Sequence, residues 1–394
     1  MIFKTPTLPA KYLQVIDSIN ELRQQLRFAT SDSLHRWTGF LARMTLARAI
    51  QETNTMEGIN ATFDDAVAAV DREDPIGPKD ENWQALVGHR EAMDYIIQLS
   101  KDAQRYAYND GTILSLHYMM MKYDLSKDPG RWRPGSVHVT NTATGKIVYE
   151  GPDVQLVPGL VAELVTFLNE QSDTSVLVRA AMAHLNLTMI HPFKDGNGRM
   201  ARALQTMVLS KDAILSPVFS SIEEYVGMNS QEYYGVLGEV GQGQWHPERD
   251  ALPFIRFCLA AHFSQATTLL RRLEQMTALW SRAEAEVKRL KLNSRVVHAL
   301  ADAALGLRVT NPTYRKQVDI SNQLAKIDLA NLAKLGLLIP KGERRGRYYL
   351  AGKFLQELRR DTRLPKTKID PFEEIEPQKV SEFLPGLAPS QTGS

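Results

Sequence analysis

The sequence contains almost no cysteine and no long apolar run, and each absence excludes a class of protein. Its 394 residues include one cysteine, Cys258, so an intramolecular disulfide cannot form. No stretch approaches the roughly eighteen apolar residues that a membrane-spanning helix needs. The first residues contain Lys4 and Lys11 but no apolar signal core. We therefore expect a cytoplasmic protein that neither spans nor binds a membrane.

Several catalytic motifs are also missing. The sequence has no Gly-x-x-x-x-Gly-Lys-Ser/Thr loop, no His-Glu-x-x-His pair and no cysteine cluster, which removes support for a Walker ATPase or a zinc enzyme. A loose dinucleotide fingerprint, Gly196-x-Gly198-x-x-Ala201, follows a helical pattern where a Rossmann fold needs a strand. We therefore do not expect a dinucleotide-binding fold.

The charge of the chain is unevenly distributed. The formal net charge is only +2, but residues 293–353 contain 11 Lys and Arg against 4 Asp and Glu. Residues 1–292 are slightly acidic, with 30 basic and 34 acidic side chains. A length of 394 residues is enough for two or three domains, so we expect a basic module beside a larger acidic one.

Apolar periodicity predicts a mainly helical larger module. From Lys11 to about Leu270 the apolar residues recur at spacings of three and four. The one clear interruption covers residues 131–153, where Val and aromatic residues alternate with polar ones on both sides of Asn-Thr-Ala-Thr-Gly. This pattern predicts a β-hairpin.

The C-terminal third has a different pattern. Three short helices are expected over residues 294–305, 312–318 and 322–335, followed by two strands around the basic segment 341–347. Three helices and a basic hairpin are typical of a winged helix-turn-helix domain. The expected division is an N-terminal helical region 1–110, a core 111–265, a linker helix 266–292, a winged helix 293–353 and a flexible tail 354–394, because the last 34 residues contain five prolines.

The most informative segment is His-Pro-Phe-Lys-Asp-Gly-Asn-Gly-Arg-Met-Ala-Arg at residues 191–202. A helix is expected to end at His191 because a proline follows, and another begins near Gly198. Gly196 and Gly198 allow the backbone amides to point at an anion, and the helix N-terminus adds partial positive charge. The segment therefore predicts a phosphate-binding loop.

Four side chains of this loop have the chemistry of a phosphate-transfer site. His191 titrates near neutrality and can accept a proton, and Asp195 can hold the divalent metal ion that accompanies a nucleotide. Arg199 and Arg202 are three residues apart and can grip different phosphates. Taken singly, each has an ordinary structural explanation; their conjunction within twelve residues indicates function.

The segment resembles the signature of the Fic family, His-Pro-Phe-x-Asp-Gly-Asn-Gly-Arg-x-x-Arg, and the resemblance extends over residues 30–265. It implies a helical bundle with a small β-hairpin flap, and transfer of AMP from ATP, with Mg²⁺ or Mn²⁺, to a hydroxyl of a target protein or of the chain itself. His191 would be the general base and Asp195 the metal ligand. The nucleotide would contact the residues that follow in the signature: Gly196, Asn197, Gly198, Arg199, Met200, Ala201 and Arg202.

A second motif, Thr53-x-x-x-Glu57-Gly58, resembles the inhibitory motif of the same family. The resemblance implies that Glu57 pairs with Arg202, reaches the ATP site and leaves ATP in a pose unsuited to attack. In some members the same glutamate supports removal of AMP, and the sequence leaves this reverse activity open.

Two further parts of the site are expected from the resemblance. Residues 137–141 of the flap, with Val137, His138, Val139 and Thr140, would either pair with an extended target segment or only cover the nucleotide. Tyr233 would either line the adenine pocket or pack in the core.

The basic module leaves its partner open. Lys326, Lys334, Arg344, Arg345 and Arg347 could neutralise DNA phosphates, but winged helices also dock proteins. The alternatives to an adenylyltransferase are therefore a DNA-binding regulator with a nucleotide-sensing or self-modifying core, and an enzyme that uses another phosphate donor. A homodimer also stays open.

Overall fold

The computed structural model describes residues 1–30, 38–75, 77–102, 106–140, 145–343, 346–366 and 369–373. These residues divide into two compact units. Unit 1 takes most of residues 1–267 together with 369–373, and unit 2 takes residues 268–366. Among the described residues, no helix has both the length and the apolar content needed to cross a bilayer.

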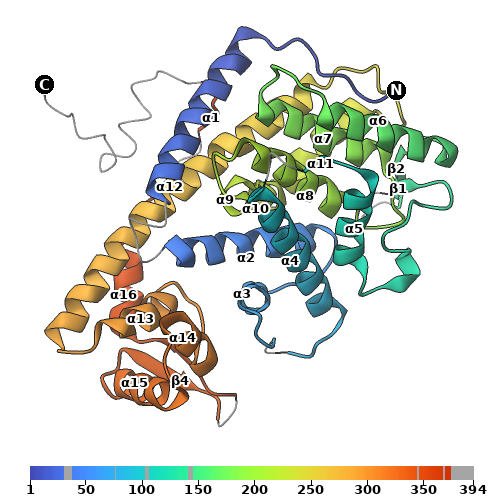
Figure 1. The fold of residues 1–394 in the computed structure, drawn as a ribbon. Coiled ribbons are helices and arrows are strands. Elements are labelled where there is room, and N and C mark those ends of the chain that lie inside the picture. The colour runs from blue at the N-terminus through green and yellow to red at the C-terminus, as the bar shows by residue number, and fades with distance from the viewer. Residues whose placement is uncertain are drawn as a thin grey trace, which may run out of the picture. The chain divides into compact units, whose positions relative to one another are not determined.

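Unit 1 is helical, as predicted (Figure 1). Its α-helices are α1 (Ala10–Ala29), α2 (Thr38–Met56), α3 (Phe63–Asp71), α4 (Glu81–Ser100), α5 (Asp110–Met121), α6 (Val157–Asn169), α7 (Val176–Ile190), α8 (Asn197–Leu209), α9 (Pro217–Ser220), α10 (Glu223–Met228), α11 (Ser230–Gly241) and the first part of α12 (Leu252–Arg289). Short 3₁₀ helices are η1 (Leu125–Lys127), η2 (Val154–Leu156) and η3 (Ser210–Asp212).

Helices α7 and α8 form the centre of unit 1. Nearly every residue of both is buried, which is the pattern of a helix surrounded on all sides by other elements. The two helices pack against each other, and α4, α5 and α6 cover them (Figure 1). The loop that joins α7 to α8 is therefore held between rigid elements.

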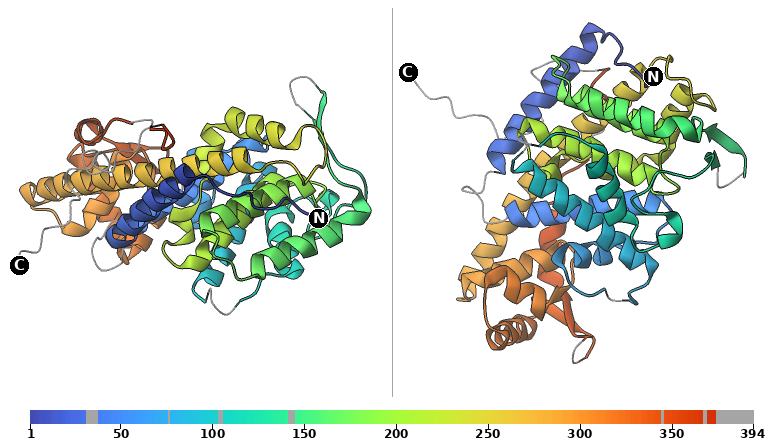
Figure 2. Two further views of the ribbon diagram at one scale, coloured as in Figure 1. Left: turned by 90° about the horizontal axis from the view of Figure 1, so that it is seen from above. Right: turned by 45° about the vertical axis from the view of Figure 1, so that its right-hand side comes forward.

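The hairpin predicted for residues 131–153 is present. Strands β1 (His138–Thr140) and β2 (Ile147–Glu150) pair antiparallel, with Val139 opposite Tyr149. The hairpin extends from the helices at one edge of unit 1 (Figure 2). Asn141, which we placed in the flap, lies outside the described residues.

Unit 2 contains the elements expected for the basic module. After the second part of α12 come η4 (Ser294–Val296), α13 (Val297–Ala304), β3 (Val309–Thr310), α14 (Asn311–Val318), α15 (Asn322–Lys334), β4 (Leu338–Lys341), β5 (Tyr348–Ala351) and α16 (Lys353–Asp361). The strands form an antiparallel sheet in the order β3-β5-β4. The helices and the strand pair agree with a winged helix, which stays a prediction, and Arg344 and Arg345 lie outside the described residues.

Two expected boundaries differ in the structure. The linker helix proposed for 266–292 is part of α12, which is continuous from Leu252, so residue 265 is not a helix boundary. The expected tail at 354–394 begins with α16, which buries Leu355 and Leu358. Further along, Asp370 accepts a hydrogen bond from Arg256 at 2.8 Å, and the rest of the tail, 374–394, lies outside the described residues.

A buried carboxylate holds the helices of unit 2 together. Asp328 on α15 is 7% exposed, and it accepts hydrogen bonds from Arg295 Nε at 2.7 Å and from Arg295 Nη2 at 2.9 Å. The Tyr314 hydroxyl of α14 donates a third hydrogen bond at 2.9 Å. One side chain therefore connects η4, α14 and α15.

Replacement of Asp328 tests this connection. Asp328→Asn should destabilise unit 2 by roughly 2 kcal/mol, because Arg295 loses its charged partner. Tyr314→Phe removes only one neutral donor and should cost about 1 kcal/mol. Amide hydrogen exchange of α15 in the full chain measures both changes. Equal protection in Asp328→Asn and in the parent would show that the carboxylate is dispensable.

Candidate active site

The loop between α7 and α8 depends on two residues in left-handed backbone conformations. His191 ends α7 with a φ of 50°, and Pro192 prevents the helix from continuing. Gly196 precedes α8 with a φ of 77°. A β-carbon at residue 196 would lie 2.9 Å from the Met121 sulfur, so only glycine fits. The turn between α7 and α8 therefore forms because of Pro192 and Gly196, as the sequence predicted.

Asn197 holds this loop in shape. Its side-chain oxygen accepts a hydrogen bond from the Phe193 N–H at 2.9 Å, and its side-chain nitrogen donates to the Phe193 carbonyl at 2.9 Å. We expected Asn197 to contact a nucleotide. In this structure its amide group is occupied within the loop, so its backbone N–H is the part that faces a ligand.

The start of α8 offers an anion-binding surface. The backbone N–H groups of Asn197, Gly198 and Arg199 have no hydrogen-bond partner within the described part of the chain. The Gly196 N–H is occupied, because it donates to Asp195 Oδ1 at 2.6 Å. Unpaired amides at a helix N-terminus carry partial positive charge. Three amides are thus available to phosphate oxygens.

His191 has the protonation state of a general base. Its Nδ1 lies 3.1 Å from the Thr188 carbonyl, which can only accept, so Nδ1 carries the hydrogen and Nε2 keeps its lone pair. Burial lowers the pKa of His191, against smaller opposing effects of Thr188, Glu57 and Asp195. The imidazole is therefore neutral near pH 7 and can accept a proton at Nε2.

Arg202 is paired with Glu57, as the second motif predicted. The guanidinium is 1% exposed, its Nη2 lies 2.6 Å from Glu57 Oε1, and its Nε donates to Thr53 Oγ1 at 2.6 Å. Burial alone would raise the pKa of Glu57, but Arg202 and Arg199 together lower it. Glu57 is therefore an anion bound to the start of α8.

The local backbone explains how Glu57 reaches this position. Helix α2 ends at Met56; just beyond it Gly58 has a φ of 80°, and the Ile59 N–H donates to the Asn54 carbonyl. A β-carbon on Gly198 would overlap the Glu57 carboxylate, so the two segments approach without a side chain between them.

A second close approach lies between α2 and α10. Where α10 passes α2, a β-carbon on Gly227 would lie 2.6 Å from Glu52 Cβ. Gly198 of α8 and Gly227 of α10 thus allow close approach to Glu57 and Glu52, at and just after the end of α2.

Arg199 is a buried cation without a carboxylate partner. It is 2% exposed, and no carboxylate of the described residues lies within ion-pair distance. Its Nη1 donates to the Tyr123 hydroxyl at 3.1 Å, its Nη2 lies 3.0 Å from the Met121 sulfur, and its Nε has no partner. A buried guanidinium normally pairs with an anion, so this residue favours a phosphate ligand.

Asp195 is the candidate metal ligand. Its Oδ2 lies 3.5 Å from Lys127 Nζ, and its side chain is 39% exposed. The part of the chain that the structure describes holds no group of three His, Cys, Asp or Glu side chains able to bind a metal. A single carboxylate is nonetheless compatible with Mg²⁺ at nucleotides, because phosphates and water supply the remaining ligands.

His117 on α5 is a supporting residue that the sequence did not reveal. Its Nε2–H donates to the Asp195 carbonyl at 3.0 Å, and its Nδ1 accepts from the Gly130 N–H at 2.9 Å. Its ring stacks on Phe193 at 3.7 Å between centroids. A lone histidine among apolar helix residues carries no signal for this role, because the two partners in the active-site loop, Phe193 and Asp195, are distant in sequence.

Three residues expected to contact the nucleotide have buried side chains in the structure. Tyr233 is 1% exposed, and its hydroxyl donates to His184 Nε2 at 2.9 Å, so it is a core residue. The side chains of Met200 and Ala201 are fully buried, and the Met200 N–H already donates to the Gly196 carbonyl. On α11 it is Tyr234, 51% exposed, that faces outward. Helical spacing did not reveal which of the two adjacent tyrosines faces the core.

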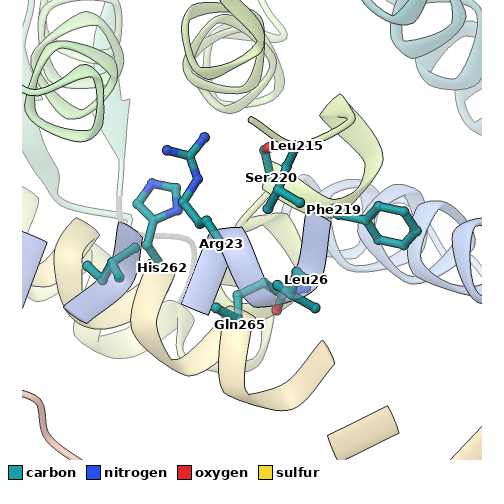
Figure 3. Close-up of a pocket in the computed structure, with 9 residues that line it drawn as sticks. Arg23, Leu26, Leu215, Phe219, Ser220, His262 and Gln265 are labelled. Carbon is teal, nitrogen blue, oxygen red and sulfur yellow. The ribbon is translucent and has the colours of Figure 1, made fainter. Parts of the chain in front are cut away.

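Tyr233 begins a chain of buried hydrogen bonds. His184 Nδ1–H donates to Gln205 Oε1 at 2.5 Å, and Gln205 Nε2 donates to His262 Nε2 at 3.0 Å. His262 lines a small cavity together with Arg23, whose guanidinium lies beside the imidazole in Figure 3. This chain holds α7, α8 and α12 in register behind the site.

The four residues expected in the flap lie at the start of the hairpin and in its first strand, β1. The Val137 carbonyl accepts a hydrogen bond from the Gly151 N–H at 3.2 Å, and His138, Val139 and Thr140 form β1. Within the described residues β1 pairs only with β2, so its outer edge is free to accept another strand.

Three buried histidines make stability depend on pH. Burial lowers the pKa of His117 to about 4, and those of His184 and His262 to about 3. The unfolded chain takes up these protons near pH 6.5, so the stabilisation is complete above pH 6.5 and is lost as the pH falls toward 4. At pH 5 the loss should be roughly 2 kcal/mol for each histidine.

Urea unfolding of the full chain at pH 7.5 and at pH 5 measures this loss. The variant His117→Gln should lose about a third of the pH dependence that these histidines contribute. Equal unfolding free energies at the two pH values would show that the histidines take up protons within the folded state.

Comparison with known proteins finds a Fic domain within unit 1. Residues 108–209 match the model of the Fic/DOC family. The protein adenylyltransferases fic-1 of Caenorhabditis briggsae and of Caenorhabditis elegans are each 26% identical, over 258 and 259 residues, which is 64% of this chain and 46% of theirs. The chain thus spans about half the length of the curated relatives it matches.

A solved structure supports the same assignment at the level of the fold. A Fic family protein from Desulfovibrio desulfuricans G20 superposes with a TM-score of 0.56 and 21% identity, covering 89% of this chain and 98% of that one. The helical fold, the loop at residues 191–202 and the family match agree. Residues 108–209 therefore contain a Fic domain.

Proposed function

We propose that the chain is a protein adenylyltransferase, which transfers AMP from ATP to a Ser, Thr or Tyr hydroxyl of a target protein or of the chain itself. The observation that carries the proposal is the pair of buried arginines at the start of α8, of which only Arg202 pairs with a carboxylate, together with a neutral His191 in the preceding loop. The name of the nematode relatives, protein adenylyltransferase, supports the same chemistry.

The reaction follows from these groups. His191 Nε2 accepts the proton of the target hydroxyl while the oxygen attacks the α-phosphorus of ATP, and the bond from that phosphorus to the pyrophosphate oxygen breaks. The amides of Asn197, Gly198 and Arg199 and the two guanidinium groups stabilise the charge on the phosphate oxygens. Asp195 would hold the Mg²⁺ or Mn²⁺ that neutralises the leaving pyrophosphate.

The flap supports a way to hold the target. The free edge of β1 can pair with an extended segment through backbone hydrogen bonds, which places a hydroxyl near His191 with little dependence on the target sequence. Since Cys258 is the one cysteine of the chain and no disulfide is needed, we propose the cytoplasm as the compartment.

The enzyme is inhibited by its own α2 in this proposal. Glu57 occupies Arg202, so the guanidinium cannot bind the terminal phosphate of ATP and the α-phosphorus is not aligned with the attacking hydroxyl. Glu57 also limits the space above Gly198. Removal of AMP from a modified target, supported by Glu57, would be a separate activity. The Glu57 variants described below can also be assayed for it.

Removal of the carboxylate should release the activity. Glu57→Gly should increase AMP incorporation from α-labelled ATP by roughly one to two orders of magnitude, because Arg202 is freed. Glu57→Gln keeps the volume without the charge and should give an intermediate rate. His191→Ala in the Glu57→Gly background should abolish transfer.

The position of the label separates the enzymatic alternatives. Retention of the α label alone supports AMP transfer, whereas retention of the γ label alone would mean that the chain transfers the terminal phosphate instead. Unchanged labelling in Glu57→Gly, with wild-type activity already high, would contradict inhibition by Glu57.

We also propose that unit 2 binds duplex DNA through α15. The exposed face of this helix carries Asn322, Gln323, Lys326, Asn331 and Lys334, and no acidic side chain. The one acid of the helix, Asp328, is buried against Arg295. Helices α14 and α15 are joined by three residues, the spacing of a helix-turn-helix. This surface matches the charge of a phosphate backbone.

Salt-dependent binding tests the surface. Lys326→Ala with Lys334→Ala should weaken binding to a labelled 20-base-pair duplex at least tenfold at low salt, and should reduce the slope of log K against log salt by about 2. Lys288→Ala with Lys291→Ala, two exposed lysines away from α15, is the matched control. Equal losses in both double variants, or no binding by the wild type, would favour a protein partner.

A further inference from the structure

Arg133 lies between the flap and the active-site loop. The side chain is buried, 4% exposed, and its three nitrogens donate to three carbonyls: Nε to His191 at 2.9 Å, Nη1 to Gly135 at 2.6 Å and Nη2 to Pro152 at 2.5 Å. Its backbone N–H donates to the Pro192 carbonyl at 2.9 Å. One residue therefore bonds to the entry of β1, to the exit of β2 and to the end of α7.

The partners of this guanidinium are unusual. Within the described part of the chain, no carboxylate lies within ion-pair distance of Arg133, so backbone carbonyls alone solvate the charge. A planar guanidinium points its N–H groups in fixed directions, and here each direction meets a different segment. A lysine ammonium has a different geometry and cannot reach all three carbonyls at once.

The segments before β1 and after β2 approach each other closely around Arg133. A β-carbon on Gly151 would lie 2.8 Å from Val137 Cγ1 and 3.5 Å from Arg133 Nη2. Glycine at this position lets the chain leaving β2 approach both the start of the flap and the guanidinium. The fork is therefore enclosed between the two ends of the hairpin.

The bond to His191 has a particular consequence. His191 has a φ of 50°, a conformation that costs a residue with a β-carbon about 1 kcal/mol or more and persists only when neighbouring groups hold it. Arg133 holds the carbonyl of this residue, and the Thr188 carbonyl holds its ring at Nδ1. The direction of Nε2 is thus determined from both ends of the residue.

We propose that Arg133 is a positioning residue for AMP transfer: it fixes the flap, which holds the target segment, at a set distance from the His191 imidazole, which accepts the target proton. The inference rests on the proposed function. Arg133 does not touch the nucleotide loop amides or the two arginines of α8, so it acts on the alignment of the hydroxyl and not on ATP binding.

The experiment uses the full chain with Glu57→Gly as the active parent. Adding Arg133→Lys should lower kcat for AMP transfer about 100-fold, the cost of a misplacement of about 1 Å, and should change the KM for ATP less than about threefold. Arg131→Lys, two residues upstream and exposed, is the matched control and should leave both values unchanged. Methylguanidinium should restore at least about tenfold of the activity lost in Arg133→Ala, because a free guanidinium can occupy the same three carbonyls.

The outcomes separate this inference from the proposed function. If the Glu57→Gly parent transfers AMP and Arg133→Lys matches it, Arg133 has no positioning role. A rise in the KM for ATP equal to the fall in kcat, without rescue by methylguanidinium, would show a general loss of structure and would also overturn the inference. If the parent itself transfers nothing, the proposed function fails. Hydrogen exchange of the Gly151 amide then tests whether Arg133 holds the ends of the flap together. Exchange should accelerate in Arg133→Lys and not in Arg131→Lys.

Discussion

Two guanidinium groups are buried at the start of α8, and only one of them faces a carboxylate. A buried positive charge requires an anion, and Glu57 supplies one carboxylate for the two guanidinium groups. The remaining charge on Arg199 and the free amides of the helix N-terminus are suited to a phosphate. In the proposed mechanism, Glu57 and the phosphates of ATP compete for the same buried positive charge, so the strength of inhibition depends on how well one carboxylate replaces a triphosphate.

The rest of unit 1 keeps these charges in place. Helices α7 and α8 are buried on all sides, and the loop between them is held from within by Asn197, from α5 by His117 and from the flap by Arg133. Each of these residues bonds to a backbone group and leaves the reacting atoms free. These supporting residues orient the reactive groups without taking part in the reaction, so a small number of reactive groups is sufficient.

The sequence predicted the loop because its causes are local. Proline after His191, glycine at 196 and the spacing of Arg199 and Arg202 act within twelve residues, and the hairpin and the short helices of unit 2 also follow from nearby residues. His117 and Arg133 escaped prediction because the contacts that connect them to the active-site loop join residues 78 and 58 positions apart. The burial of Tyr233 and the position of α16 within the expected tail could not be predicted for a related reason: the face that a side chain presents, and the anchoring of a proline-rich end, depend on tertiary packing.

The contact at Gly227 gives α10 an influence over the site. Since backbone meets side chain there with no intervening atoms, α2 cannot keep its present position if α10 moves toward it, and it loses its support if α10 moves away. Glu52, which forms the contact, directly precedes Thr53, which bonds to Arg202. The six-residue α10 therefore helps to fix the position of the helix whose last turn carries Thr53, a hydrogen-bond partner of Arg202.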